Sequence, residues 1–253
     1  MKSGIQPDAV SLFDTDDLSI GFVERILCKQ GITDIIGVDE AGRGPLAGPV
    51  VAAAVALPDG YIPEGLNDSK KLSEAKRNVL YGDILDNALA IGISFSSPEI
   101  IDKENILQAT LKAMSEAIDQ ASERLKMPPL CLIDGNRRVC TPFRQQTLVK
   151  GDSKSSNIAA ASIVAKVVRD FWMDAAESFY PGYGLAKHKG YGVKAHKAAI
   201  KDIGPCILHR LTFRGVREHI NEHPELQREY QNRVKSGLQI FSSVTPSAKK
   251  PNQ

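Results

Sequence analysis

The chain has 253 residues, 42% of them hydrophobic and 25% charged, which is long enough to bury an apolar core without disulfides or a structural metal. Lys and Arg number 32 against 30 Asp and Glu, so any basic surface for an anionic partner must be local. No stretch approaches about 20 apolar residues, and the N-terminus is acidic where a signal peptide is basic, so we expect a soluble, cytoplasmic protein. The four cysteines form no CxxC pair, and we expect reduced thiols at Cys28, Cys131, Cys140 and Cys206.

The first half of the chain predicts three strands. A polar lead-in, 1–16, is followed by a short helix that ends at Gly31, a suitable C-cap. Apolar runs at 35–38 and 50–58 predict two strands joined by a Gly-rich turn, and the alternating pattern at 88–97 predicts a third.

Helices dominate the rest of the predicted order. Helices are expected after Ser73, over 104–125, over 155–179 and near 193–203. Ser155 or Ser156 is the expected N-cap of the third of these helices. Strands are expected at 130–133 and 147–151. Three consecutive strands, then helix, strand, strand and helix, indicate an α/β fold: a mixed sheet in which an antiparallel meander is followed by parallel strands, flanked by helices.

A glycine-rich segment after the first strand excludes one kind of site. Residues 42–47 match the GxGxxG/A pattern of dinucleotide-binding folds. That pattern needs a long helix after the glycines, whereas Pro45 and Pro49 break this segment and a strand follows at once. The dinucleotide interpretation is therefore rejected.

Acidic residues at strand ends carry the chemistry. Asp39 and Glu40 close one strand, Asp134 closes another, and Asp152 precedes the 155–179 helix. Clustered carboxylates repel unless a divalent cation binds, and oxygen donors suit Mg²⁺ or Mn²⁺ better than zinc. The pattern indicates metal-dependent phosphoryl transfer. Each acid taken singly is also compatible with a cap or a solvated turn.

Six segments in one order resemble bacterial ribonuclease HII, of the type 2 RNase H family. They are DEAGRG with the following PLAGPVVAAAV from Asp39, NDSKKLS at 67–73, LIDGN at 132–136, KGDSKS at 150–155, AAASIVAKVVRD at 159–170 and HKGYG at 188–192. The resemblance covers about 37–213. It implies an RNase H-like fold and a two-metal endonuclease that hydrolyses RNA in RNA–DNA hybrids. It further implies incision 5′ of ribonucleotides embedded in duplex DNA, leaving 3′-OH and 5′-phosphate ends.

The resemblance also implies residue roles. The metal-binding and catalytic acids are Asp39, Glu40, Asp134 and Asp152. Among the substrate-binding residues, Gly42, Arg43 and Gly44 read the ribose 2′-OH and phosphates, and Tyr191 packs on the neighbouring sugar. Lys150 and Lys189 are the remaining substrate-binding residues. Glycines beside an arginine fit this role because backbone groups without a Cβ can approach a ribose closely. The alternative for Arg43 is a turn arginine paired with Asp39 or Glu40.

Other residues near these motifs keep two interpretations. Asp170 follows Lys166 by four residues, which predicts a helical ion pair, with a supporting part in the metal site as the alternative. Lysines in these segments would form a local basic groove. His188, His196 and His209 are not spaced as a metal cluster, and we expect phosphate contacts or structural roles.

We divide the chain into an N-terminal extension with one short helix at 1–36, a catalytic domain at 37–216, and a C-terminal helical segment with a disordered tail at 217–253. The alternative function is a non-catalytic hybrid-binding module, which would require the loss of an acid. The apolar stretch Leu238–Phe241 loosely resembles motifs that dock on the sliding clamp, or it folds back on the domain. We expect a monomer without membrane contact.

Overall fold

The computed structural model describes residues 19–220 together with Pro224 and Arg228. The predicted lead-in at 1–16 and the apolar stretch Leu238–Phe241 lie outside these residues. No helix in this part of the chain is both long and apolar enough to cross a membrane. The thiols of Cys28, Cys131, Cys140 and Cys206 form no disulfide within the described residues; Cys131 is buried and Cys140 is exposed.

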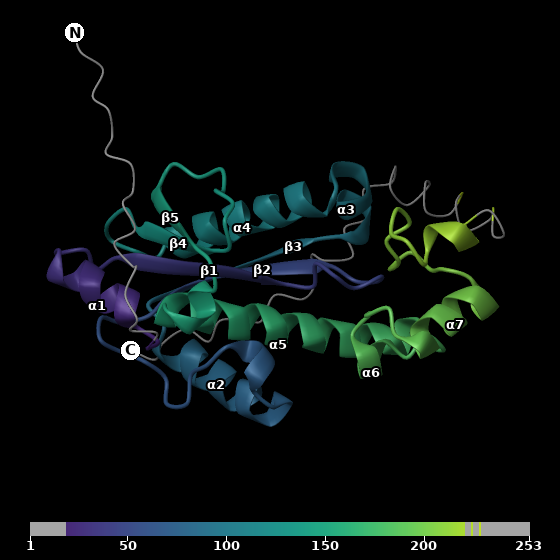
Figure 1. Cartoon of the computed structure of the whole chain (residues 1–253), viewed down its shortest axis with the longest axis horizontal. Coiled ribbons are helices and arrows are strands. Elements are labelled where there is room, and N and C mark those ends of the chain that lie inside the picture. Colours follow the sequence, from purple (N-terminus) through teal and green to yellow (C-terminus); the bar gives the residue numbers. More distant parts are fainter. Residues whose placement is uncertain (1–18, 221–223, 225–227, 229–253) are drawn as a thin grey trace, which may run out of the picture. The chain divides into compact units, whose positions relative to one another are not determined.

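Five strands form one sheet in the order β3-β2-β1-β4-β5 (Figure 1). They are β1 Ile35–Ala41, β2 Val50–Ala56, β3 Ala90–Ser96, β4 Leu130–Asp134 and β5 Arg144–Leu148. β4 lies parallel to β1 and to β5. The turn at 42–49 is too short for a crossover, so β2 returns antiparallel to β1. The amide of Leu89 donates to the carbonyl of Ala56, so β3 starts where β2 ends. The predicted mixed sheet is confirmed.

The helices follow the predicted order, with two additions. They are α1 Phe22–Lys29, α2 Glu74–Asn87, α3 Pro98–Glu104, α4 Ile106–Ser122, α5 Ser156–Phe179, α6 Leu185–His188 and α7 Lys194–Ile203, with 3-10 turns at Ser69–Lys71, Gly151–Ser153 and Arg217–His219. The short helices α3 and α6 were not predicted. Asn105 has φ 71° and separates α3 from α4, and its side chain accepts from the amides of Leu107 and Gln108.

The last strand was placed wrongly from the sequence. We predicted it at 147–151, but β5 ends at Leu148 and its burial pattern is mostly intermediate. Lys150 has φ 56°, which no strand residue adopts, and the turn Gly151–Ser153 follows it. The apolar pair Leu148 and Val149 therefore marks the end of the strand, not its centre.

The chain divides into two compact units that interleave along the sequence. Among the described residues, the first holds 19–39, 53–92 and 114–165, and the second holds 40–52, 93–113 and 166–220.

In the first unit, helix α5 begins in direct contact with strand β1. A Cβ built on Gly37 would lie 2.1 Å from the carbonyl carbon of Asn157, so only glycine allows this approach. The Asn157 side chain then accepts from the Leu57 amide at 2.7 Å, which ties the helix to the residue after β2. α4 approaches β3 in the same manner, since a Cβ on Gly92 would lie 2.0 Å from the carbonyl oxygen of Ala117.

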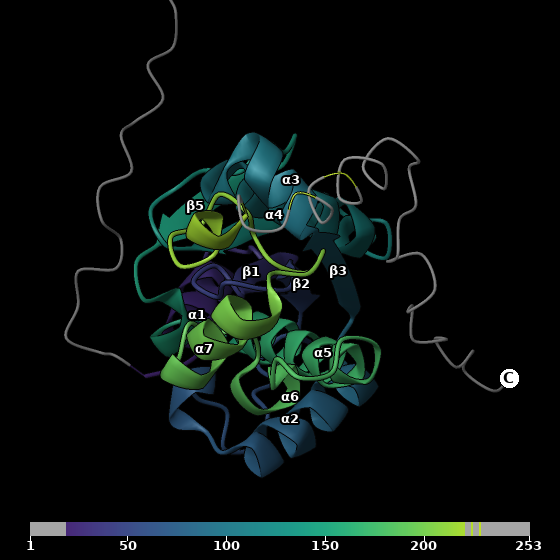
Figure 2. The same cartoon turned by 90° about the vertical axis from the view of Figure 1, so that its right-hand side faces the viewer.

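In the second unit, the C-terminal half of α5 packs against the short helices that follow it (Figure 2). Their contact is an apolar cluster of buried residues with Ala199 of α7 packed against it: Ala47, Met173, Ala176, Tyr183, Leu185 and Leu208. Through Leu185 the cluster packs α6 against α5, and the last residue of α6, His188, begins the HKGYG motif.

We expect Gly37→Ala to lower the free energy of unfolding by about 3 kcal/mol, because the added methyl group overlaps the backbone of α5. Urea unfolding followed by circular dichroism measures the change. Gly82→Ala is the matched control: this glycine lies inside α2 with nothing within 4 Å of a built Cβ, so stability should stay level or rise by up to about 1 kcal/mol. Equal effects of the two substitutions would contradict the close-contact interpretation.

Candidate active site

Four aspartates of the first unit come together around one lysine. Asp39 belongs to β1, Asp134 ends β4, and Asp152 lies in the turn before α5. Asp68, which was not predicted as a site residue, caps the 3-10 turn that carries Lys70. We call these four aspartates the acidic cluster.

Two hydrogen bonds fix the local geometry of the acidic cluster. Oδ1 of Asp134 accepts from the amide of Gly151 at 2.8 Å, which ties the end of β4 to the turn that carries Asp152. A Cβ on Gly151 would lie 2.5 Å from Cδ1 of Ile158 and 3.2 Å from Oδ1 of Asp134, so a side chain here would crowd both residues. The amide of Lys70 donates to Oδ1 of Asp68 at 2.9 Å.

Glu24 of α1 fixes the start of α5 and was missed from the sequence. Its Oε1 accepts from the Ser155 hydroxyl at 2.5 Å, from the Asn157 amide at 3.1 Å and from the Asn157 side chain at 3.0 Å. Ser155 is the predicted N-cap, accepting from the amide of Ile158 at 3.1 Å. A carboxylate at a helix N-terminus is favourable because it accepts otherwise unpaired amides. The only signal in the sequence was the position of Glu24 in a predicted helix.

The acidic cluster gathers negative charge around Lys70. Burial and the charges of Asp68 and Asp134 raise the pKa of the Asp152 carboxyl, against the opposing charge of Lys70. Burial lowers the pKa of the Lys70 ammonium, but the charges of the acidic cluster outweigh burial and raise it overall. A cation near these carboxylates is therefore favoured, and Lys70 supplies only one positive charge.

The donor set fits a hard divalent cation. It consists of carboxylate oxygens, and a bound cation would relieve the repulsion that raises the pKa of Asp152. Within the described residues, no three acidic, histidine or cysteine side chains are spaced to hold a metal ion as they stand.

The fourth predicted acid, Glu40, belongs to the second unit and contacts the predicted reading arginine. Nη1 of Arg43 lies 3.3 Å from Oε1 of Glu40. This is one of the two ion pairs proposed as the alternative role of Arg43. The Arg43 side chain is 49% exposed, so the pair is weak and the guanidinium is accessible to a ligand.

The two glycines beside Arg43 have different surroundings: a side chain would clash at Gly42 but not at Gly44. We call residues 42–49 the glycine loop. Gly42 has φ 97°, and a Cβ there would lie 2.0 Å from Nε of Arg169, so its missing side chain makes room for a buried arginine. At Gly44 the nearest atom to a built Cβ is Cε1 of Tyr191, at 3.8 Å. Only Gly44 therefore leaves the open space that we expected at both glycines.

The predicted substrate-binding side chains differ in their accessibility. We call residues 188–192 the tyrosine loop. Tyr191 is 45% exposed and faces Gly44, which leaves part of its ring open. The Lys189 ammonium is paired with Asp174, and its side chain is only 15% exposed. Lys150 is exposed, so of the two predicted lysines only this one has a solvent-facing side chain as the structure stands.

The ribonuclease HII family model matches residues 36–216. The chain belongs to this family. It is 52% identical over 208 residues to the ribonuclease HII of Geobacter metallireducens, a match that covers 82% of this chain and 96% of that protein. Among solved structures, it resembles ribonuclease H2 from Pyrococcus horikoshii OT3 with a TM-score of 0.63 at 23% identity, covering 74% of this chain and 97% of that one.

A second similar structure is titled as the PCNA:RNase HII complex from Archaeoglobus fulgidus, with a TM-score of 0.59 at 26% identity, covering 71% of this chain and 95% of that one. The family and the RNase H-like fold predicted from the six segments are confirmed, and the protein is a ribonuclease H enzyme. The individual site residues remain predictions.

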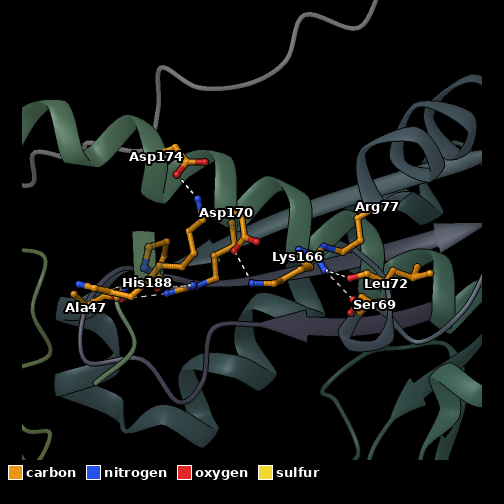
Figure 3. Close-up of polar contacts among 12 residues, drawn as sticks. Ala47, Ser69, Leu72, Arg77, Lys166, Asp170, Asp174 and His188 are labelled. Carbon is orange, nitrogen blue, oxygen red and sulfur yellow. Dashed lines mark hydrogen bonds and ion pairs between the residues drawn. The ribbon is translucent and has the colours of Figure 1, made fainter. Parts of the chain in front are cut away.

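In this ribonuclease HII, Asp170 forms the predicted helical ion pair. Its Oδ1 lies 2.7 Å from Nζ of Lys166, one turn earlier on α5, and Figure 3 shows the two side chains facing each other. The same close-up shows Asp174 one turn further along the helix. Asp174 forms the ion pair with Lys189. The supporting role of Asp170 at a metal site stays a prediction.

Three histidines that are distant in sequence meet in the second unit. The rings of His188 and His196 stack with centroids 4.4 Å apart, and Nε2 of His196 lies 3.1 Å from Nε2 of His209. The amide of Cys206 donates to Nδ1 of His209, so His209 carries its proton on Nε2. This Nε2–H donates to Nε2 of His196. His196 in turn donates from Nδ1 to the Tyr191 carbonyl at 2.9 Å. Burial lowers the pKa of His209 to about 3. The structural role proposed for these residues fits this chain of hydrogen bonds.

The contrast between the two loop glycines can be tested. We expect Gly42→Ala to lower the free energy of unfolding by about 3 kcal/mol because the methyl group overlaps Arg169 and φ is positive. Gly44→Ala should change it by less than about 1 kcal/mol, since the nearest contact is an ordinary one. Its effect should appear instead as weaker binding of a duplex with one ribonucleotide. Denaturant unfolding of both variants decides the stability part, and equal losses of stability would contradict it.

Proposed function

We propose that this ribonuclease HII hydrolyses the RNA strand of RNA–DNA hybrids and incises duplex DNA 5′ of embedded ribonucleotides. In this reaction water adds to the phosphorus and the bond to the 3′ oxygen of the preceding nucleotide breaks, leaving 3′-OH and 5′-phosphate ends. The observation that carries the proposal is the acidic cluster, whose gathered carboxylates raise the pKa values of Asp152 and of Lys70. Family membership supports the same chemistry.

Asp39, Asp134 and Asp152, with Glu40 as the residue after Asp39, would hold two divalent cations, Mg²⁺ or Mn²⁺. Bound cations supply activation of water and stabilisation of the leaving oxygen. The protein's own contribution is to hold the carboxylates: the Gly151 amide orients Asp134, and the Glu24 cap fixes the start of the helix behind Asp152. Lys70 keeps the acidic cluster partly neutralised before a cation binds.

The glycine loop and Tyr191 are proposed to select the ribose. The open space at Gly44 allows the backbone to reach a 2′-OH, which distinguishes RNA from DNA. The exposed guanidinium of Arg43 can leave Glu40 for a phosphate oxygen, because a weak exposed pair is easily exchanged. The exposed face of the Tyr191 ring is suited to pack on a sugar. Lys150 and Lys189 complete the proposed set, and Lys189 must first release Asp174.

The alternative, a non-catalytic hybrid-binding module, is less well supported. It would require the loss of a catalytic acid, whereas Asp39, Glu40, Asp134 and Asp152 are all present. A nuclease without ribose selection would not need a loop glycine with free space beside an exposed tyrosine.

We further propose cytoplasmic action as a monomer and a weak contact with the sliding clamp through Leu238–Phe241, which lies outside the described residues. The archaeal relative named as part of a PCNA complex supports a clamp contact in this family. Chance matches to short apolar motifs are common, and the competing interpretation is that this stretch packs on the domain.

Asp134→Asn should abolish cleavage in Mg²⁺ while binding of a duplex with one ribonucleotide survives. The amide keeps the size of the side chain and can still accept from Gly151, but it removes a charged ligand. Thermal stability without metal should stay level or rise, because carboxylate repulsion is relieved. Asp86→Asn, on the exposed face of α2, is the control and should retain activity within about twofold of wild type. Turnover of Asp134→Asn within about tenfold of wild type would exclude Asp134 as a metal ligand.

The clamp contact is tested by Leu238→Ala combined with Phe241→Ala. As a docking motif, the pair should lose affinity for the bacterial sliding clamp without a change in melting temperature. As part of the core, it should lower the melting temperature by roughly 4 °C or more. A synthetic peptide of residues 233–246 that shows no clamp binding at millimolar concentration would rule out docking.

A further inference from the structure

Two arginine side chains of the second unit are fully enclosed. Arg169 on α5 is 1% exposed, and Arg210 in the segment after α7 is 0% exposed. Burial lowers their pKa values to about 10 and about 9, so both stay protonated near neutral pH. Burying a charge is costly unless hydrogen bonds compensate for the lost water. The partners of these guanidiniums therefore show which part of the structure depends on them.

Arg169 joins the glycine loop to the tyrosine loop. Its Nε donates to the carbonyl of Pro49 at 2.9 Å and its Nη2 to the carbonyl of Ala47 at 3.2 Å. Its Nη1 donates to the carbonyl of Lys189 at 3.0 Å. One planar group thus sets the distance between two backbone segments more than 100 residues apart in sequence.

Arg210 holds the other end of the glycine loop. Its Nη1 donates to the carbonyl of Arg43 at 2.8 Å, and its Nη2 donates to the carbonyl of Gly42. Nε and Nη2 both reach the carbonyl of Gly48, at 3.1 Å and 2.9 Å. The two guanidiniums therefore bind main-chain carbonyls at both ends of the glycine loop, at residues 42–43 and 47–49.

Backbone contacts lock the two loops together around the arginines. The Leu46 amide donates to the Gly190 carbonyl at 2.8 Å, and the Arg210 amide donates to the Leu46 carbonyl at 2.8 Å. A Cβ on Gly190 would lie 2.4 Å from the Ala47 carbonyl oxygen, so the loops are in van der Waals contact. Neither loop can shift without moving the other.

The direction of the bound carbonyls fixes the direction of the loop amides. In a trans peptide the C=O and the following N–H point in opposite directions. Because the carbonyls of Gly42 and Arg43 point at Arg210, the amides of Arg43 and Gly44 point away from it. These are the backbone donors that a ribose or phosphate oxygen would meet at the open position of Gly44.

We infer that Arg169 and Arg210 are positioning residues for ribose selection: they aim the amides of Arg43 and Gly44 and hold Tyr191 opposite them. This inference rests on the proposed function, in which the glycine loop and Tyr191 select the ribose. Lysine at either position keeps the charge, but its three donors lie on one nitrogen and cannot reproduce the contacts that the separate nitrogens of the planar guanidinium make.

The test measures the affinity for a duplex with one ribonucleotide relative to the all-DNA duplex of the same sequence, in EDTA, by fluorescence anisotropy. Arg210→Lys should reduce this preference by about tenfold or more, while affinity for the all-DNA duplex stays within about threefold. Gly190→Ala should do the same with both guanidiniums in place, because its methyl group pushes the loops apart. Should Arg210→Lys fail to fold, Gly190→Ala decides the question.

Two controls match these changes. Arg25→Lys replaces an exposed arginine that also donates to a main-chain carbonyl, and Gly60→Ala replaces a glycine of φ +72° with nothing within 4 Å. Both should keep the preference. If Arg210→Lys and Gly190→Ala keep it within about twofold while only the free energy of unfolding falls, the arginines are merely structural and the inference is overturned.

Arg43→Ala separates this inference from the proposed function. If wild type shows no preference, or Arg43→Ala keeps all of it, the glycine loop does not read ribose and the proposed function of the loop fails together with the inference. If Arg43→Ala loses the preference but Arg210→Lys and Gly190→Ala keep it, the loop reads ribose and only the positioning role is wrong.

Discussion

The close approach of helix α5 to backbone without side chains is the constraint on which the rest of the structure depends. In the first unit the helix begins against Gly37 of β1, and in the second unit it packs Arg169 against Gly42 and Met173 against Gly48. A methyl group at any of these glycines would overlap the helix. One helix thereby sets the turn that carries an acid and the loop proposed to read ribose, each within its own unit.

The two units balance charge in opposite ways. The acidic cluster leaves carboxylates close together with one lysine, an arrangement that favours a further cation. Around Arg169 and Arg210, positive charge is buried and satisfied by neutral carbonyl dipoles. In the acidic cluster, repulsion between carboxylates lowers stability but favours cation binding. Around the two arginines, buried charge instead holds the main-chain carbonyls in one orientation.

Local sequence patterns predicted most helices and strands. Features that depend on contacts between distant residues could not be predicted from the sequence. The acids at strand ends and the N-cap at Ser155 could be read from the sequence because each depends on its neighbours in the chain. The end of β5 could not, since Lys150 adopts a positive φ that nothing in its residue type requires. The requirement for glycine at position 42 also could not be predicted, because it depends on the distant contact with Arg169, which no local sequence pattern indicates.

The hydrogen-bonded histidines next to Tyr191 should be observable in solution by NMR spectroscopy. Because the Cys206 amide occupies Nδ1 of His209, a single proton lies between the two facing Nε2 atoms, and each imidazole is fixed in one tautomer. Such a buried N–H exchanges slowly with solvent and should give a resolved imidazole proton resonance. Burial lowers the pKa of both His209 and His196, so the signal should persist for as long as both rings stay neutral, and it would report whether the carbonyl of Tyr191 is still held in place.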